Sequence, residues 1–149
     1  MATIDLTYQE CLDLLRSERV GRIGVIVEDQ PLIFPVNYRV IEDIDGATIP
    51  RLVWVALRTR AGNVIDRSPM FVAFEIDHFD HAQRLGWSVL LSGTLQPVDD
   101  AAAEFAGRFD PGPWLDDRDR WLAIEPTRVT GRRIVGDDAE WAFSTAAYL

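Results

Sequence analysis

Short segments rich in β-branched and aromatic residues, separated by turn sequences, make up most of this 149-residue chain. Such segments favour β-strands, and short turns between them join neighbouring strands as antiparallel hairpins. About six or seven antiparallel strands close most economically as a small barrel. We therefore expect a mostly β fold with short helices, built as a six-stranded antiparallel barrel. The strand segments lie at residues 20–27, 32–40, 52–57, 70–76, 87–95, 121–124 and 129–134.

A proline interrupts the second of these segments. Pro35 donates no hydrogen bond to a neighbouring strand, so this segment is expected to be an edge strand, or to bend or bulge there. Backbone groups beside such an interruption are left to face a ligand. Asn37 and Tyr38 follow directly, and a planar heterocycle needs polar groups of this kind beside flat apolar walls.

Helical patterns are fewer and shorter. Thr7 and Glu10 have the spacing of a capping box, and apolar residues recur at helical spacing behind them, which predicts a helix at residues 7–17. A second helix is expected at 101–109, where the sequence Asp110-Pro111-Gly112-Pro113 ends it.

The chain length fits one domain over residues 1–149. With 48% hydrophobic and 26% charged residues, the composition is that of a globular protein rather than a disordered one. The domain is expected to comprise the helix at 7–17, a barrel at about 20–135 and a C-terminal tail at 136–149.

The net charge of −9 argues against nucleic acid and anionic membranes as partners, because such binders present basic surfaces. The longest basic run is Arg132-Arg133, and no apolar run is long enough to span a bilayer. Cys11 is the only cysteine, so no intrachain disulfide is expected, which suits a reducing cytoplasm. The N-terminal sequence lacks the features of a signal peptide, and we expect a cytoplasmic protein.

The two histidines offer a weak metal-binding pattern. His78 and His81 lie among acidic residues in the polar segment 77–85, which is expected to be an exposed loop. No cysteine or third histidine accompanies them, so no metal site is expected. A Gly-x-Ser-x-Gly elbow of hydrolases is also missing from the sequence.

A candidate phosphate site follows the strand segment at 52–57. Arg58 supplies a guanidinium, Thr59 a hydroxyl, and Gly62 allows close backbone approach beside Asn63. The loop from 59 to 66 is expected to open a short helix, whose first N–H groups would add donors. These groups suit a phosphate monoester, although a solvated turn explains the same residues equally well.

Taken in order, these segments resemble the pyridoxamine 5′-phosphate oxidase-like family of flavin-binding split barrels, and within it the branch related to nitroimidazole-resistance proteins. The resemblance spans about residues 7–135 and depends on the order and spacing of the pieces. These are the first helix with Arg19-Val20-Gly21-Arg22-Ile23-Gly24, then Pro31 to Tyr38, Arg58-Thr59 with Gly62, Val72 to Asp77, Gly86 to Leu90 with Gly93, and Val129 to Ile134.

The resemblance implies a split barrel that forms a homodimer and binds FMN in two equivalent clefts between the subunits. The isoalloxazine ring would be lined by Pro35, Val36, Asn37 and Tyr38. Arg58 and Thr59 would hold the phosphate, and Gly62 and Asn63 would close the loop. Trp87 and Ser88 would lie beside the cofactor.

One position departs from the family pattern, because relatives carry a lysine where this chain has Val64. Loss of that cation would weaken phosphate binding, so a deazaflavin or another ligand could replace FMN. The expected function is a flavin-dependent oxidoreductase that transfers a hydride or electrons, with Tyr38 as the candidate proton donor. The alternative is a non-catalytic protein that binds or senses a flavin or deazaflavin.

Overall fold

The computed structural model describes residues 2–42, 53–66, 69–98 and 108–136. One helix and seven strands lie within these ranges. In chain order they are β1 (Ala2–Asp5), α1 (Tyr8–Ser17), β2 (Val20–Val27), β3 (Gln30–Ile41), β4 (Trp54–Thr59), β5 (Met70–Asp80), β6 (Leu85–Pro97) and β7 (Arg120–Val135).

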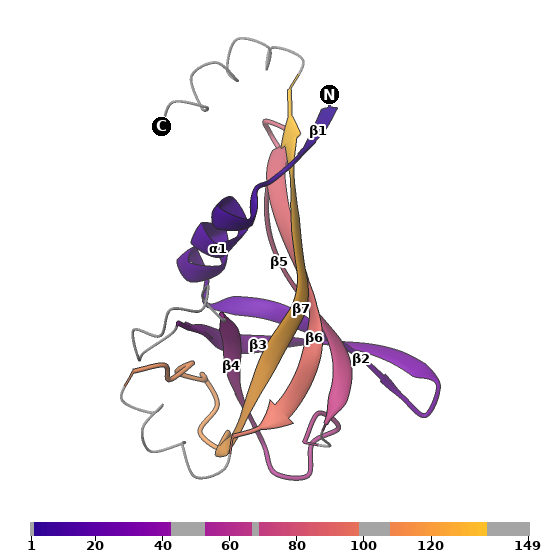
Figure 1. The fold of residues 1–149 in the computed structure, drawn as a ribbon, viewed down its shortest axis with the longest axis vertical. Coiled ribbons are helices and arrows are strands. Elements are labelled where there is room, and N and C mark those ends of the chain that lie inside the picture. The colour runs from indigo at the N-terminus through magenta and orange to yellow at the C-terminus, as the bar shows by residue number, and fades with distance from the viewer. Residues whose placement is uncertain (1, 43–52, 67–68, 99–107, 137–149) are drawn as a thin grey trace.

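Six of the strands form a closed ring. The sheet runs in the order β1-β7-β4-β3-β2-β5-β6, and β6 also pairs with β7, which closes the barrel (Figure 1). Every pairing is antiparallel. The structure thus confirms the predicted six-stranded antiparallel barrel, and β1 adds a short strand outside the ring.

The long strand β7 has three neighbours. β6 pairs with it along one edge, whereas the other edge is shared by two strands. Residues Arg120 to Ile124 pair with β4, and Arg132 to Val135 pair with β1. The first and last described strands of the chain therefore lie side by side (Figure 1).

Pro35 lies where β3 changes partners. Residues 30–37 of β3 pair with β2, and residues 38–41 pair with β4. On the side away from β2, the first part of β3 therefore has no strand partner among the described residues. This confirms the expected edge position of Pro35, and it leaves that side of the barrel open for a cleft.

The barrel interior is filled by side chains from all six strands, with α1 packed against it. Tyr38 and Phe74 are fully buried and meet edge to face, with their ring centroids 4.9 Å apart. The buried face of α1 consists of Cys11, Leu12 and Leu15. Among the described residues, no helix has both the length and the apolar character needed to cross a membrane.

The structure confirms Thr7 as the N-cap of α1, which is one half of the expected capping box. The Glu10 amide donates a hydrogen bond to the Thr7 hydroxyl oxygen over 3.2 Å, so Thr7 satisfies a backbone donor that has no partner within the helix. The turn between β2 and β3 is confirmed as well. Glu28 and Asp29 both have positive φ, at 53° and 61°, as a two-residue hairpin turn requires.

Several local expectations were wrong. The segment 77–85 is not an exposed loop, because β5 continues to Asp80 and β6 begins at Leu85. The strands expected at 121–124 and 129–134 are one continuous strand, β7, and β1 was not expected. The described residues after β4 contain no helix, because residues 60–66 form turns and bends. The predicted helix at 101–109 falls mostly outside the described residues.

Candidate functional site

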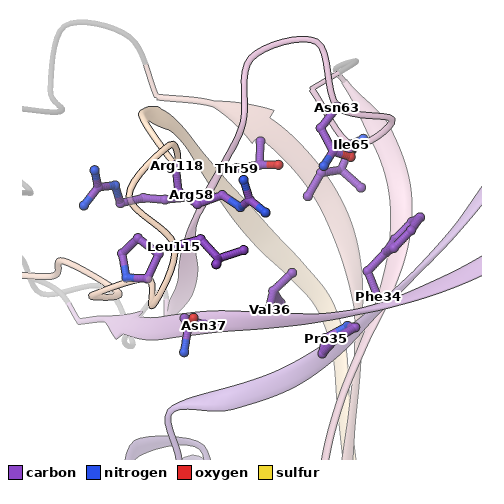
Figure 2. Close-up of a pocket in the computed structure, with 11 residues that line it drawn as sticks. Phe34, Pro35, Val36, Asn37, Arg58, Thr59, Asn63, Ile65, Leu115 and Arg118 are labelled. Atoms are coloured by element: carbon purple, nitrogen blue, oxygen red, sulfur yellow. Dashed lines mark hydrogen bonds between the residues drawn. The ribbon is translucent and has the colours of Figure 1, made fainter.

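A cleft of about 180 Å³ opens beside the part of β3 that lacks a second strand partner (Figure 2). Residues from β3, from the end of β4 and from the turn after it form part of the lining. The remainder comes from residues 110–118, which precede β7 and are called the 110–118 segment below. The lining residues are Phe34, Pro35, Val36, Asn37, Arg58, Thr59, Asn63, Ile65, Pro113, Leu115 and Arg118.

Arg58 is held in place from two sides. Its Nη1 lies 3.1 Å from one carboxylate oxygen of Asp110, and its guanidinium carbon lies 5.2 Å from the centroid of the Trp121 ring. The Nε atom is buried and donates no hydrogen bond within the described part of the chain. A buried donor without a partner is costly, so Arg58 is a candidate ligand-binding side chain.

Thr59 and Asn63 continue the polar side of the cleft. Thr59 is only 3% exposed, although it ends a strand. Asn63 accepts a hydrogen bond from the Ile65 amide, and the Gly62 amide donates to Asp66 over 2.9 Å. This last bond, with the guanidinium of Arg120, lowers the pKa of Asp66. The turn after β4 is therefore ordered by its own polar contacts.

The 110–118 segment contacts the cleft at two points. Asp110 binds Arg58, and the Trp114 amide donates to the Asn37 side-chain oxygen over 3.2 Å. Asp110 also accepts a hydrogen bond from the Gly112 amide, and Gly112 has a positive φ of 60°. These contacts hold the segment beside the cleft, which Pro113 and Leu115 line. Figure 2 shows Leu115 across from β3.

Six of the residues expected to bind the cofactor come together in this cleft. They are Pro35, Val36, Asn37, Arg58, Thr59 and Asn63. Gly62 lies in the same turn, where its φ of 79° suits glycine, but it does not line the cleft.

Tyr38 points the other way. It is fully buried in the core, and its hydroxyl donates to the Leu15 carbonyl over 2.6 Å. Its ring packs against Phe74 in the barrel interior. The expectation that Tyr38 lines the ring or donates a proton there is corrected by this placement, because its hydroxyl is already bonded to the helix.

Trp87 and Ser88 lie on β6, away from the cleft of their own chain. Trp87 is partly buried, packs against the core and stacks on His78, with ring centroids 6.4 Å apart. Val64 is also partly buried against the core, and the cleft is lined by its neighbours Asn63 and Ile65 instead. The Val64 side chain, at the position where a lysine was expected, therefore packs against the core.

Sequence reasoning missed five lining residues, namely Phe34, Ile65, Pro113, Leu115 and Arg118. Phe34 could have been found, because it precedes Pro35 in the interrupted strand. The residues of the 110–118 segment gave no such signal, since Pro113 was interpreted only as the end of a helix. Within the described residues there is no group of three or more metal-ligating side chains.

The lining combines two chemistries. Flat apolar surfaces come from Phe34, Pro35, Val36 and Leu115, whereas Arg58 and Thr59 supply donors. This combination suits a planar ring that carries an anionic group. Among the lining residues there is no carboxylic acid, histidine, lysine, cysteine or tyrosine, so none of them offers a proton for acid–base catalysis at neutral pH.

The chain is similar in sequence to a known protein family and to one protein of Mycobacterium tuberculosis. The model of the family described as pyridoxamine 5′-phosphate oxidase matches residues 7–133. The uncharacterized protein Rv0080 of Mycobacterium tuberculosis is 36% identical over 142 residues, which cover 90% of this chain and 87% of that protein.

Two solved structures are similar over most of their length. A conserved protein of unknown function from Corynebacterium diphtheriae is 32% identical with a TM-score of 0.69, over 89% of this chain and 98% of that one. The FAD binding protein of Mycobacterium smegmatis is 30% identical with a TM-score of 0.62, over 90% of this chain and 100% of that one.

Proposed function

This chain belongs to the pyridoxamine 5′-phosphate oxidase family, and from this premise we propose that its cleft binds a flavin, either FMN or a deazaflavin, for oxidoreductase chemistry. The observation that carries the proposal is the buried Nε of Arg58, which lacks an acceptor at the polar end of a cleft with flat apolar walls. The Mycobacterium smegmatis relative, described as an FAD binding protein, supports a flavin-type ligand.

Different lining residues bind different parts of the flavin. Arg58 and Thr59 hold the phosphate, and Pro35, Val36 and Leu115 lie against the ring and exclude water from it. Asn37 keeps the 110–118 segment in place through the Trp114 amide. When bound, a flavin supplies hydride or electron transfer through its ring, and the protein positions that ring and tunes it by hydrogen bonds.

We further propose that two copies of the chain pair and complete each other's cleft. Three large apolar side chains on the outer barrel surface support this, since Ile26, Ile33 and Phe71 are 72%, 71% and 70% exposed. The strand register brings these residues to one part of the sheet. Gly24, two residues before Ile26, pairs with Ile33 on β3 and with Ala73 on β5, and Ala73 is two residues after Phe71. In this arrangement Trp87 and Ser88 approach the cleft of the other copy.

The buried Cys11 thiol supports a cytoplasmic location.

The test is an absorption spectrum of the purified protein, followed by mass analysis of any released ligand and by titration with riboflavin, FMN and a deazaflavin. We expect a flavin spectrum, or saturable quenching of flavin fluorescence. Absence of binding by all these ligands would overturn the proposal.

A non-catalytic binding or sensing protein is the second candidate. It is favoured by one observation, namely that no lining side chain is a proton donor at neutral pH. Reduction of the bound flavin by a nicotinamide or by a reduced deazaflavin distinguishes the two functions. An enzyme should be reduced and then reoxidised by a substrate, whereas a binding protein should hold its flavin without turnover.

A further inference from the structure

The 110–118 segment is attached to two residues that the proposed function assigns to the cleft. Its Asp110 carboxylate accepts hydrogen bonds from Nη1 of Arg58 at 3.1 and 3.4 Å, and its Trp114 amide donates to the Asn37 side chain over 3.2 Å. Arg58 and Asn37 both line the cleft. An anionic group that binds Arg58 therefore meets a carboxylate of the same chain at the same guanidinium.

Asp110 is placed where another anion can take its position. Its side chain is 40% exposed, against 23% for Arg58, so the carboxylate can move into water while the guanidinium stays over the Trp121 ring. A carboxylate and a phosphate both accept hydrogen bonds from a guanidinium. A phosphate carries more negative charge and three acceptor oxygens, whereas a partly exposed carboxylate pair is weak. A phosphate is therefore the stronger partner for Arg58.

The order of the 110–118 segment depends on this contact. Asp110 also accepts a hydrogen bond from the Gly112 amide over 3.0 Å. Beyond the buried Pro111, residues 112–117 are exposed or half-buried, so few apolar contacts hold them. Loss of the Asp110 contact should therefore loosen the segment, including Leu115, which lines the cleft.

We propose that Asp110 is a specificity-determining residue, because an anionic group of the ligand displaces it from Arg58 and thereby loosens the 110–118 segment. This inference rests on the proposed function. A flavin without a phosphate leaves the Arg58–Asp110 pair closed and binds against an ordered segment. A phosphorylated flavin gains Arg58 and loses that order. Asp110 thus lowers the affinity for the phosphate and couples phosphate binding to the position of Leu115.

The first test compares riboflavin with FMN, which differ by the phosphate, in the wild type and in Asp110→Asn. We expect the substitution to tighten FMN about threefold or more, the size of a partly exposed ion pair, and to leave riboflavin unchanged. Asp13→Asn is the matched control, since Asp13 also pairs with an arginine, Arg16 of α1. A smaller gain for FMN, or an equal gain for riboflavin, would overturn the proposal.

The second test uses the wild-type protein, so it does not depend on how a variant folds. Hydrogen exchange of the Gly112 and Trp114 amides, followed by NMR, reports on the segment, because both amides are hydrogen-bonded there. At saturation, FMN should make both amides exchange about threefold faster, or more, than riboflavin does. A smaller difference, or slower exchange with FMN, would mean that the segment stays closed on the phosphate and would overturn the proposal.

Inorganic phosphate separates this inference from the proposed function. It carries the anion without the ring, and it should speed exchange of the same two amides, whereas sodium chloride at equal ionic strength should not. If no flavin binds, the proposed function fails, and the phosphate titration alone decides whether an anion displaces Asp110. If flavins bind but neither FMN nor phosphate speeds exchange, only the role of Asp110 fails.

Discussion

At the scale of single residues, Arg58 is the side chain on which the proposed site depends most. It lies at the end of a buried strand, is fixed by Asp110 and Trp121, and still presents a buried donor without an acceptor. Arg19, in contrast, lies just after α1, where its guanidinium reaches the Arg16 carbonyl at 3.4 Å. Both residues carry the same charge, but only Arg58 lines the cleft.

We predict that Arg58→Ala weakens flavin binding by about 10- to 100-fold, since a hydrogen bond to a charged group contributes about 1.5–3 kcal/mol. Arg19→Ala serves as the control and should leave affinity unchanged. Fluorescence quenching of FMN measures both. Equal affinities in the two variants would place the phosphate elsewhere.

At the scale of elements, one hydrogen bond joins the end of α1 to the barrel. The Tyr38 hydroxyl on β3 donates to the Leu15 carbonyl of α1 over 2.6 Å. This carbonyl lies in the last turn of the helix, where no amide further along the helix can reach it. Burial raises the pKa of Tyr38, because the charged phenolate would lose its hydration.

We predict that Tyr38→Phe lowers the free energy of unfolding by about 1 kcal/mol near neutral pH. In the wild type this free energy should fall as the pH rises above about 10, where an unfolded tyrosine loses its proton but the folded one keeps it. Tyr38→Phe should lose less stability over this range. Denaturant unfolding measured from pH 7 to 11 checks both effects.

Burial also raises the pKa of Cys11, so this thiol too makes the free energy of unfolding fall as the pH rises. Cys11→Ala therefore serves as the control that separates the two groups. If Tyr38→Phe and the wild type lose stability in parallel above pH 10, the phenol is not responsible.

A second prediction at this scale concerns the contact between β6 and β7. Their register shifts between Ser92 and Gly93, and a Cβ added to Gly93 would lie 2.2 Å from the Glu125 carbonyl oxygen. We predict that Gly93→Ala lowers the free energy of unfolding by about 2–3 kcal/mol, because the backbone of β7 must move. Chemical denaturation of the two proteins measures this difference.

The control is Gly24→Ala on β2. There the nearest atom to an added Cβ is the Ala73 Cβ at 3.7 Å, an ordinary contact. This variant should change stability by less than about 1 kcal/mol. A similar loss in both variants would mean that the close approach at Gly93 is not the cause.

The elements also show which parts of this structure a sequence can predict. The spacing of apolar residues and the residues of the turns predicted β2, β3 and α1, because these signals come from residues that are close together in the sequence. The turn after β4 was expected to become helical, but its polar side chains accept hydrogen bonds from backbone amides of the same turn instead. Arg118 joined the site only through folding of the 110–118 segment, and such long-range contacts leave no local pattern.

At the scale of the whole molecule, the outer surface carries an unusual apolar group on a strongly acidic protein. Ile33 and Phe71 are 71% and 70% exposed, although the chain has a net charge of −9. Large exposed apolar side chains close together are typical of interfaces between subunits. The proposed pairing would cover them and bring the two clefts near the shared surface.

We predict a mass about twice 16.8 kDa by light scattering at micromolar concentration. The double variant Ile33→Glu with Phe71→Glu should be monomeric, because pairing would bury carboxylates, and its flavin affinity should fall if the cleft is shared. Tyr8→Glu, on the exposed face of α1, controls for added charge. A monomeric wild type would contradict the shared cleft.

The position of β7 in the ring also bears on how the chain folds during its synthesis. β4 and β6 both need β7 as a neighbour, and β1, made first, pairs with its last residues. A ribosome delivers the chain from the N-terminus, so the barrel stays open until β7 has emerged. During that interval the unpaired edges of β4 and β6 are exposed to other nascent chains. Emergence of β7 from the ribosome is then the step that allows the barrel to close.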